Sequence, residues 1–166
     1  MKKVLCAALV SALAMGAAWA ANADTFAPVG SPAPLSGTIT YWTDGSPGYT
    51  CTLTLNTVIT SSTMTFPSGS LTPSSYPCGL IVPTFSPAWS VSVNASTGGV
   101  ATGLDIANFT FVTIFSNCRD TIQAQWNDAA NTLTIPYQSF GTGAPGSNCQ
   151  IQGVLSTPTN VSITVP

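Results

Sequence analysis

The residues that could carry out acid–base or nucleophilic chemistry are few in this chain. The sequence has 166 residues, with five acidic side chains, three Lys and Arg, and no His. Without an imidazole it has no Ser–His–Asp triad and no His-ligated metal. Asp105 and Asp120 could in principle form the acid pair of a glycosidase, but nothing in their spacing supports this role. We therefore predict that the protein is not an enzyme and has no catalytic residue, no metal and no cofactor.

Cysteines are the second reactive group. Cys51, Cys78, Cys118 and Cys149 follow the N-terminal segment, and none of them belongs to a Cys-x-x-Cys motif. The sequence therefore gives little support to zinc binding or thiol redox chemistry, and an even number of cysteines in an exported chain indicates disulfides. Four cysteines allow three pairings, and their spacing alone does not choose among them.

An internal repeat favours one pairing. Residues 63–71 (TMTFPSGSL) match residues 132–140 (TLTIPYQSF) at an offset of 69 residues, and the cysteines keep nearly the same offset. Residues 51–93 and 118–165 would then be two copies of one unit. Each copy would carry its own bridge, which favours Cys51–Cys78 and Cys118–Cys149. Chance similarity between Thr-rich alternating segments is the alternative.

The chain begins like an exported bacterial protein. Residues 1–23 combine two early lysines, a short apolar run and Ala-x-Ala sites ending at Ala20 and Ala23, which predicts a cleaved signal peptide; a retained membrane anchor is the alternative. Cleavage would leave Arg119 as the one cation against five Asp, too little positive charge to hold a nucleic acid. No later segment is long and apolar enough to span a bilayer. We predict a secreted, extracellular protein that crosses the periplasm, with no nucleic-acid partner and no membrane span.

The elements that would position these residues are β-strands. Apolar and polar residues alternate with a period of two over residues 52–55, 63–66, 121–126 and 132–137, with turn signals between such runs. This predicts an all-β fold, an antiparallel immunoglobulin-like β-sandwich stapled by disulfides, in one domain over residues 38–166. Residues 24–37 are rich in Pro and Gly and predict a flexible or extended N-terminal arm. Such an arm could add a strand to a neighbouring sheet.

Two groups of aromatic residues could contact a ligand. Residues 109–115 place Phe109, Phe111 and Phe115 on one face of a strand. A strand covered on both sides is one interpretation, and an apolar contact strand exposed to a partner or an oily ligand is the other. The tryptophans outside the leader could form a sugar-stacking platform, although filling the core is their more usual role. These are Trp42, Trp89 and Trp126.

Several segments around the cysteines carry a family resemblance. They are TCTLTLN around Cys51, SYPCGLIVP around Cys78, PAWSVSV, SNCRDTI around Cys118 and SNCQIQGVLSTP around Cys149. Together they resemble the small secreted bacterial family called protein activator of alkane oxidation, PraB. The resemblance covers most of the chain from Gly37 onward. It implies an exported, non-enzymatic protein that promotes growth on long-chain hydrocarbons, is tied to surface attachment and biofilm, and has no catalytic residues.

Two functional hypotheses follow for the expected partners. The first is an accessory protein that acts where the cell surface meets hydrocarbon, and it rests on the family resemblance. The second is a self-associating adhesin or fibre subunit of the biofilm matrix, based on the N-terminal arm, the alternating strands and a Ser/Thr-rich surface of low charge.

Overall fold

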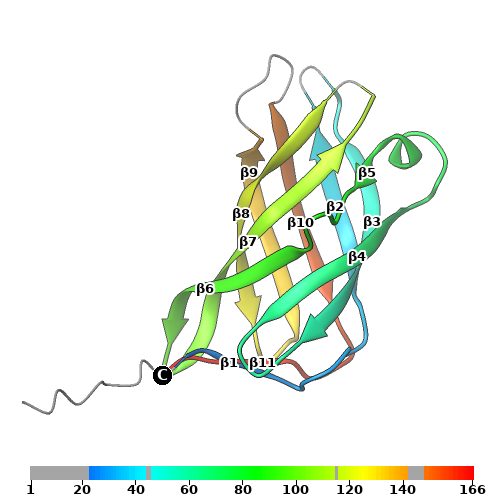
Figure 1. The fold of residues 1–166 in the computed structure, drawn as a ribbon. Helices are drawn as coiled ribbons and strands as arrows, with labels where there is room; N and C mark the ends of the chain where they lie inside the picture. Colours follow the sequence, from blue (N-terminus) through cyan, green and yellow to red (C-terminus); the bar gives the residue numbers. More distant parts are fainter. Residues whose placement is uncertain (1–22, 44–45, 115, 142–147) are drawn as a thin grey trace, which may run out of the picture.

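The computed structural model describes residues 23–43, 46–114, 116–141 and 148–166, so all of the predicted signal peptide except Ala23 lies outside it. Eight antiparallel strands close into a barrel (Figure 1). The wall strands are β2 (Leu35–Trp42), β3 (Tyr49–Ile59), β4 (Met64–Thr72), β6 (Trp89–Thr97), β7 (Val100–Val112), β8 (Asn117–Asn127), β9 (Thr132–Phe140) and β10 (Cys149–Ser156). The remaining elements are β1 (Thr25–Ala27), β5 (Val82–Pro83), β11 (Ser162–Thr164) and the short 3-10 helix η1 (Cys78–Leu80).

The predicted immunoglobulin-like β-sandwich is wrong, while the all-β fold is confirmed. The wall runs β2-β3-β4-β6-β7-β8-β9-β10, and β10 pairs back to β2, so the strands form one closed sheet rather than two. Alternation of apolar and polar residues predicts that each strand has one buried face, and strands have one buried face in a sandwich and in a barrel alike. Closure of the sheet into a barrel depends instead on the length and bending of its strands. The 13-residue strand β7 pairs with both β6 and β8, and register shifts in both ladders add the twist that brings the ends of the sheet together.

Aromatic side chains fill the barrel interior. Trp89 is fully buried and its ring lies 4.4 Å from Phe85 and 4.4 Å from Phe109 between centroids. Phe109 in turn lies 5.3 Å from Phe140, and Phe111 lies 5.5 Å from Tyr41. This packing makes the interior a core of side chains, as expected for a barrel of this size.

The segments matched by the sequence repeat are β4 and β9, and each follows a cysteine-bearing strand, β3 and β8. Their buried positions coincide: Met64, Phe66 and Leu71 in β4 correspond to Leu133, Ile135 and Phe140 in β9. The C-terminal ends of the two predicted copies, residues 51–93 and 118–165, fall on strands with different neighbours, β6 and β11. β6 lies between β4 and β7, whereas β11 pairs with β1 and meets β7 at a single residue pair.

The disulfide bonds join Cys51 to Cys78 and Cys118 to Cys149, the two pairs that the repeat favours. The first links β3 to η1. The second links β8 to β10, which are both neighbours of β9. Each bridge therefore holds together segments that are not adjacent in the hydrogen-bonded sheet.

The N-terminal residues pair within their own chain. Thr25–Ala27 form β1 and lie antiparallel to β11, and Gly30 bridges to Ile59 at the end of β3. β2 begins at Leu35, so the predicted boundary at residue 37 falls inside a wall strand. Among the residues that the structure describes, no helix is long and apolar enough to cross a membrane.

Candidate functional site

The structure places the predicted contact strand mainly inside the barrel. Phe109 and Phe111 are fully buried and belong to the aromatic core, and Phe115 lies outside the described residues. Trp89 and Trp126 are also buried, whereas Trp42 is only half-buried. Apolar surface near this strand therefore comes from other side chains.

The two candidate acids each have partners of their own. Asp105 accepts a hydrogen bond from Asn94 Nδ2 at 2.5 Å, and Asp120 accepts one from the Thr121 backbone N–H at 2.8 Å. Asp105 faces Gln123 in the β7–β8 ladder, three residues from Asp120, or about 10 Å along the strand. The structure does not bring these carboxylates together as an acid pair. Within the described part of the chain, no group of three or more potential metal ligands occurs.

One end of the barrel carries a concentration of exposed apolar side chains. Tyr76 is 73% exposed, Ile114 is 72% exposed and Leu80 is 42% exposed. They surround a small hollow of about 110 Å³. It is lined by Tyr41, Thr43, Tyr49, Tyr76, Pro77, Leu80, Ile81, Thr113 and Ile114. We call this surface the apolar end.

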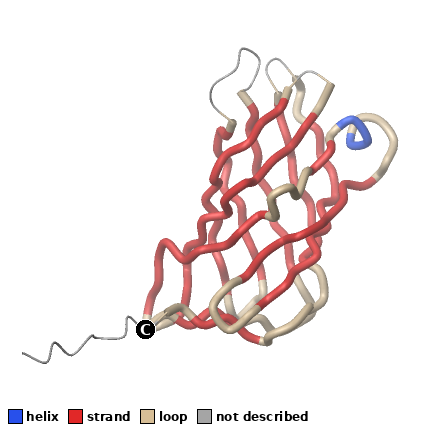
Figure 2. The backbone as a smooth tube through the Cα atoms, viewed as in Figure 1, coloured by secondary structure: helices blue, strands red, loops and turns tan. Residues whose placement is uncertain are grey.

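The fold gathers the apolar end from distant segments of the chain. The end of β2, the start of β3, η1 and the residues after β7 meet there. Figure 2 shows η1 as the blue segment beside this end of the barrel. The Cys51–Cys78 bridge fastens η1 to β3. Gly79 permits the tight turn, because a Cβ on it would lie 1.9 Å from the Ser74 carbonyl oxygen. Tyr76 and Leu80 thus sit on a covalently anchored turn, and Ile114 approaches them from the end of β7.

Tyrosine and threonine side chains supply hydroxyl groups around the hollow. Tyr41 is fully buried, and its hydroxyl lies 3.5 Å from Ser116 Oγ and 2.9 Å from Cys149 Sγ. Burial raises the pKa of Tyr41 above its usual 10.0, and the hydrogen bond with Ser116 opposes this rise. A hydrogen bond with Tyr76 raises the pKa of Tyr49. These groups are neutral at physiological pH, and none of the described residues that line the hollow carries a charge.

The buried Tyr41 hydroxyl gives a testable pH dependence. An unfolded tyrosine loses its proton near pH 10, whereas folded Tyr41 keeps it to higher pH, so above pH 10 the unfolded state binds fewer protons. The contribution of this group to stability is therefore intact below about pH 10 and is lost as the pH rises toward its folded-state pKa. Tyr41→Phe is expected to flatten this alkaline loss, measured as the denaturant midpoint at rising pH. An equally steep loss in the variant would contradict the prediction.

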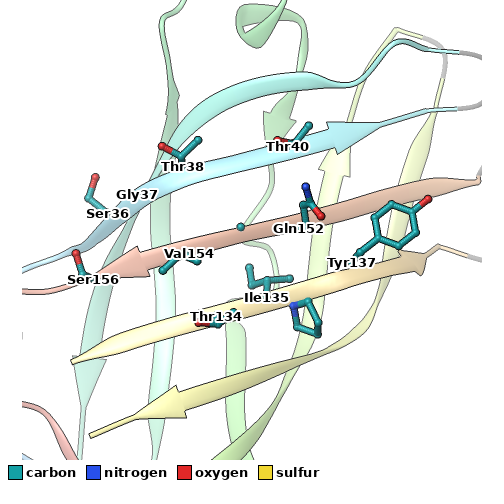
Figure 3. Close-up of a pocket in the computed structure, with 12 residues that line it drawn as sticks. Ser36, Gly37, Thr38, Thr40, Thr134, Ile135, Tyr137, Gln152, Val154 and Ser156 are labelled. Atoms are coloured by element: carbon teal, nitrogen blue, oxygen red, sulfur yellow. The ribbon is translucent and has the colours of Figure 1, made fainter. Parts of the chain in front are cut away.

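A second hollow lies on the outer wall of the barrel. It spans the outer faces of β2, β10 and β9 and has a volume of about 700 Å³ (Figure 3). Seven of its twelve lining residues carry a hydroxyl or amide side chain, including the exposed Tyr137, and the other five are Gly, Pro, Ile and Val. We call this surface the wall groove. Of its described lining residues, none carries a charge.

Comparison with models of protein families assigns the chain to a family. The family model described as alkane oxidation protein activator PraA/PraB-like matches residues 1–165. The chain belongs to this family. The resemblance carried by the segments around the cysteines is thereby confirmed, and the family is one of activators of alkane oxidation. A search of curated proteins and a search of solved structures find no match.

Sequence reasoning did not single out the exposed residues of this PraA/PraB-like chain. Tyr76 and Leu80 flank Cys78, and the signal was the Pro77-Cys78-Gly79 segment, whose residue types favour a turn over a strand. Tyr137 follows Pro136 within an alternating run, and a proline inside a strand signals a bulge. Both signals are residues that interrupt the regular hydrogen-bonding pattern of a strand.

Proposed function

We propose that the protein is a secreted, non-enzymatic accessory factor that contacts hydrocarbon outside the cell and promotes its use, with the apolar end as its contact surface. Membership of an alkane oxidation activator family supports the link to hydrocarbons. The two disulfides are compatible with an oxidising compartment. The observation that carries the proposal is the grouping of Tyr76, Leu80 and Ile114 around a hollow at one end of the barrel, whose described lining residues carry no charge.

The proposed contact is physical rather than chemical. An alkane offers no hydrogen-bonding group, so its only favourable interactions with a protein are dispersion and the removal of apolar surface from water. A compact patch of exposed apolar side chains supplies both. Anchoring of η1 by Cys51–Cys78 keeps Tyr76 and Leu80 in place before contact, which lowers the ordering cost of adsorption.

Adsorption to hexadecane tests this function. Leu80→Ser combined with Ile114→Ser is expected to weaken adsorption of the oxidised protein to the hexadecane–water interface by roughly tenfold or more, because burying each side chain contributes about 1.5–3 kcal/mol. The measurement is the adsorption isotherm from interfacial tension at neutral pH.

A matched control comes from the opposite end of the barrel. Val29 is 67% exposed and Val58 is 39% exposed, close to the exposures of Ile114 and Leu80, and both lie near the far end of β3. Val29→Ser combined with Val58→Ser is expected to adsorb like the native protein. Equal weakening in both double variants would show that adsorption is not localised at the apolar end. If the native protein fails to adsorb and forms large assemblies in the aqueous phase, the matrix-adhesin alternative replaces this proposal.

A further inference from the structure

The wall groove has a different chemistry from the apolar end. Figure 3 shows hydroxyl side chains of β2 and β10 along the groove, with Gln152, Thr40 and the Tyr137 ring gathered at one end. Outward-facing residues on β10 from Gln152 to Ser156 extend over about 13 Å of strand. Apolar side chains such as Val154, which is 49% exposed, are scattered among these hydroxyl groups.

A β-bulge turns Tyr137 outward. Between the pairs Ile151↔Gln138 and Gly153↔Ile135, two residues of β9, Pro136 and Tyr137, oppose a single residue of β10. Proline cannot donate to a ladder, and such an insertion changes the direction of the side chains that follow it. Tyr137 is consequently 58% exposed, although Ile135 two residues earlier is buried.

Neighbouring groups hold this bulge in place. The Gln138 side chain replaces a backbone partner of β8: its Oε1 accepts from the Gln123 N–H at 2.9 Å, and its Nε2 donates to the Gln123 carbonyl at 2.6 Å. The Tyr137 ring packs edge-to-face on Trp42, with centroids 5.4 Å apart. An exposed aromatic ring is thus positioned on rigid strands beside hydroxyl and amide groups.

These features fit one class of ligand. A sugar ring has an apolar C–H face that packs on an aromatic ring, and hydroxyl groups at its edge that exchange hydrogen bonds with Thr, Ser and Gln side chains. The described residues that line the groove carry no charge, which complements a neutral polymer and gives no partner to an anionic one. The groove is open along the barrel wall, so a long polymer chain can lie in it without threading through an opening. The scattered apolar side chains lack the contiguous core that a protein partner would need.

We propose that the wall groove binds a neutral polysaccharide, with one sugar ring on Tyr137 and the chain running along β10. This site shares no lining residue with the hollow of the apolar end and does not depend on the proposed contact with hydrocarbon. Binding involves no charge, so we expect it to persist in about 1 M NaCl, where the Debye length is about 3 Å.

Affinity electrophoresis tests this site. The oxidised protein, without its predicted signal peptide, is run in native gels that contain galactomannan, xyloglucan or dextran, with alginate as the anionic comparison. We expect at least one neutral polymer to retard the protein. The dependence of the retardation on polymer concentration then gives the dissociation constant. Tyr137→Ala is expected to weaken this binding by roughly tenfold, whereas Tyr137→Phe keeps the ring and the affinity.

Tyr76→Ala is the matched control, because it removes an even more exposed tyrosine from the apolar end. It should leave polysaccharide binding unchanged, just as Tyr137→Ala should leave adsorption to hexadecane unchanged, so the two proposals can fail separately. Each variant is first shown to unfold at the midpoint of the native protein. Retardation by none of the neutral polymers, retardation by alginate alone, or equal retardation of Tyr137→Ala would overturn the proposal. So would a dimer that depends on Tyr137, since the groove would then be a self-association surface.

Discussion

Trp89→Ala is expected to lower the free energy of unfolding by about 3–5 kcal/mol, a large share of the stability of a domain of this size. Trp89 is fully buried, and its ring contacts Phe85, Phe109 and Phe111. Its indole Nε1 donates a hydrogen bond to the Thr84 carbonyl at 2.8 Å. The substitution therefore opens a cavity in the aromatic core and leaves a carbonyl without its partner.

Two further variants separate these causes. Trp89→Phe keeps most of the ring packing but lacks the hydrogen bond to Thr84. We therefore expect it to lower the free energy of unfolding by about 1–3 kcal/mol. Trp42→Ala removes a half-buried indole from the barrel surface and should cost less than Trp89→Ala. Chemical denaturation followed by circular dichroism gives the three values. A loss for Trp89→Ala no larger than that for Trp42→Ala would show that Trp89 is not central to the core.

The sequence was sufficient to predict an antiparallel all-β fold because burial follows the strand period. In β8, for example, Ile122, Ala124 and Trp126 are buried, as their alternation with polar residues indicates. The same period describes a sandwich and a barrel equally well. What closes this sheet is the pairing of β7 with β8, together with the bulges beside it, and neither has a signature in apolar alternation.

Candidate surface residues were harder to predict, because small shifts in register exchange the two faces of a strand. The run from Phe109 to Phe115 contains apolar residues of both parities, and nothing in it says which set faces the core. In the structure Phe109 and Phe111 face inward, while Ile114, beyond the end of β7, is exposed. Tyr137 shows the converse case, since the bulge at Pro136 moves it out of the face that alternation assigned to it.

Removal of either disulfide is the second large effect. The bridges span 27 and 31 residues, so the chain-entropy model gives nearly equal contributions, roughly 3–4 kcal/mol each. Cys51→Ala with Cys78→Ala, and Cys118→Ala with Cys149→Ala, are therefore expected to lower the free energy of unfolding by similar amounts. The double variants avoid free thiols that could form new pairs. Denaturant titration of the oxidised proteins measures both losses.

The local consequences of the two removals should differ, because the bridges fasten different parts of the barrel. Cys51–Cys78 anchors η1, where the Gly79 N–H donates to the Ser75 carbonyl at 2.9 Å and the Ile81 N–H donates to the Cys78 carbonyl at 3.1 Å. Without the anchor, these amides should exchange with solvent through local opening, at a rate well above that set by global unfolding. Cys118–Cys149 ties β8 to β10, so its loss should leave these amides exchanging only through the global transition. Hydrogen exchange over residues 73–81 that is equally fast in both double variants would show that η1 is not held by its own bridge, and the apolar end would lose the rigidity on which its proposed contact with hydrocarbon depends.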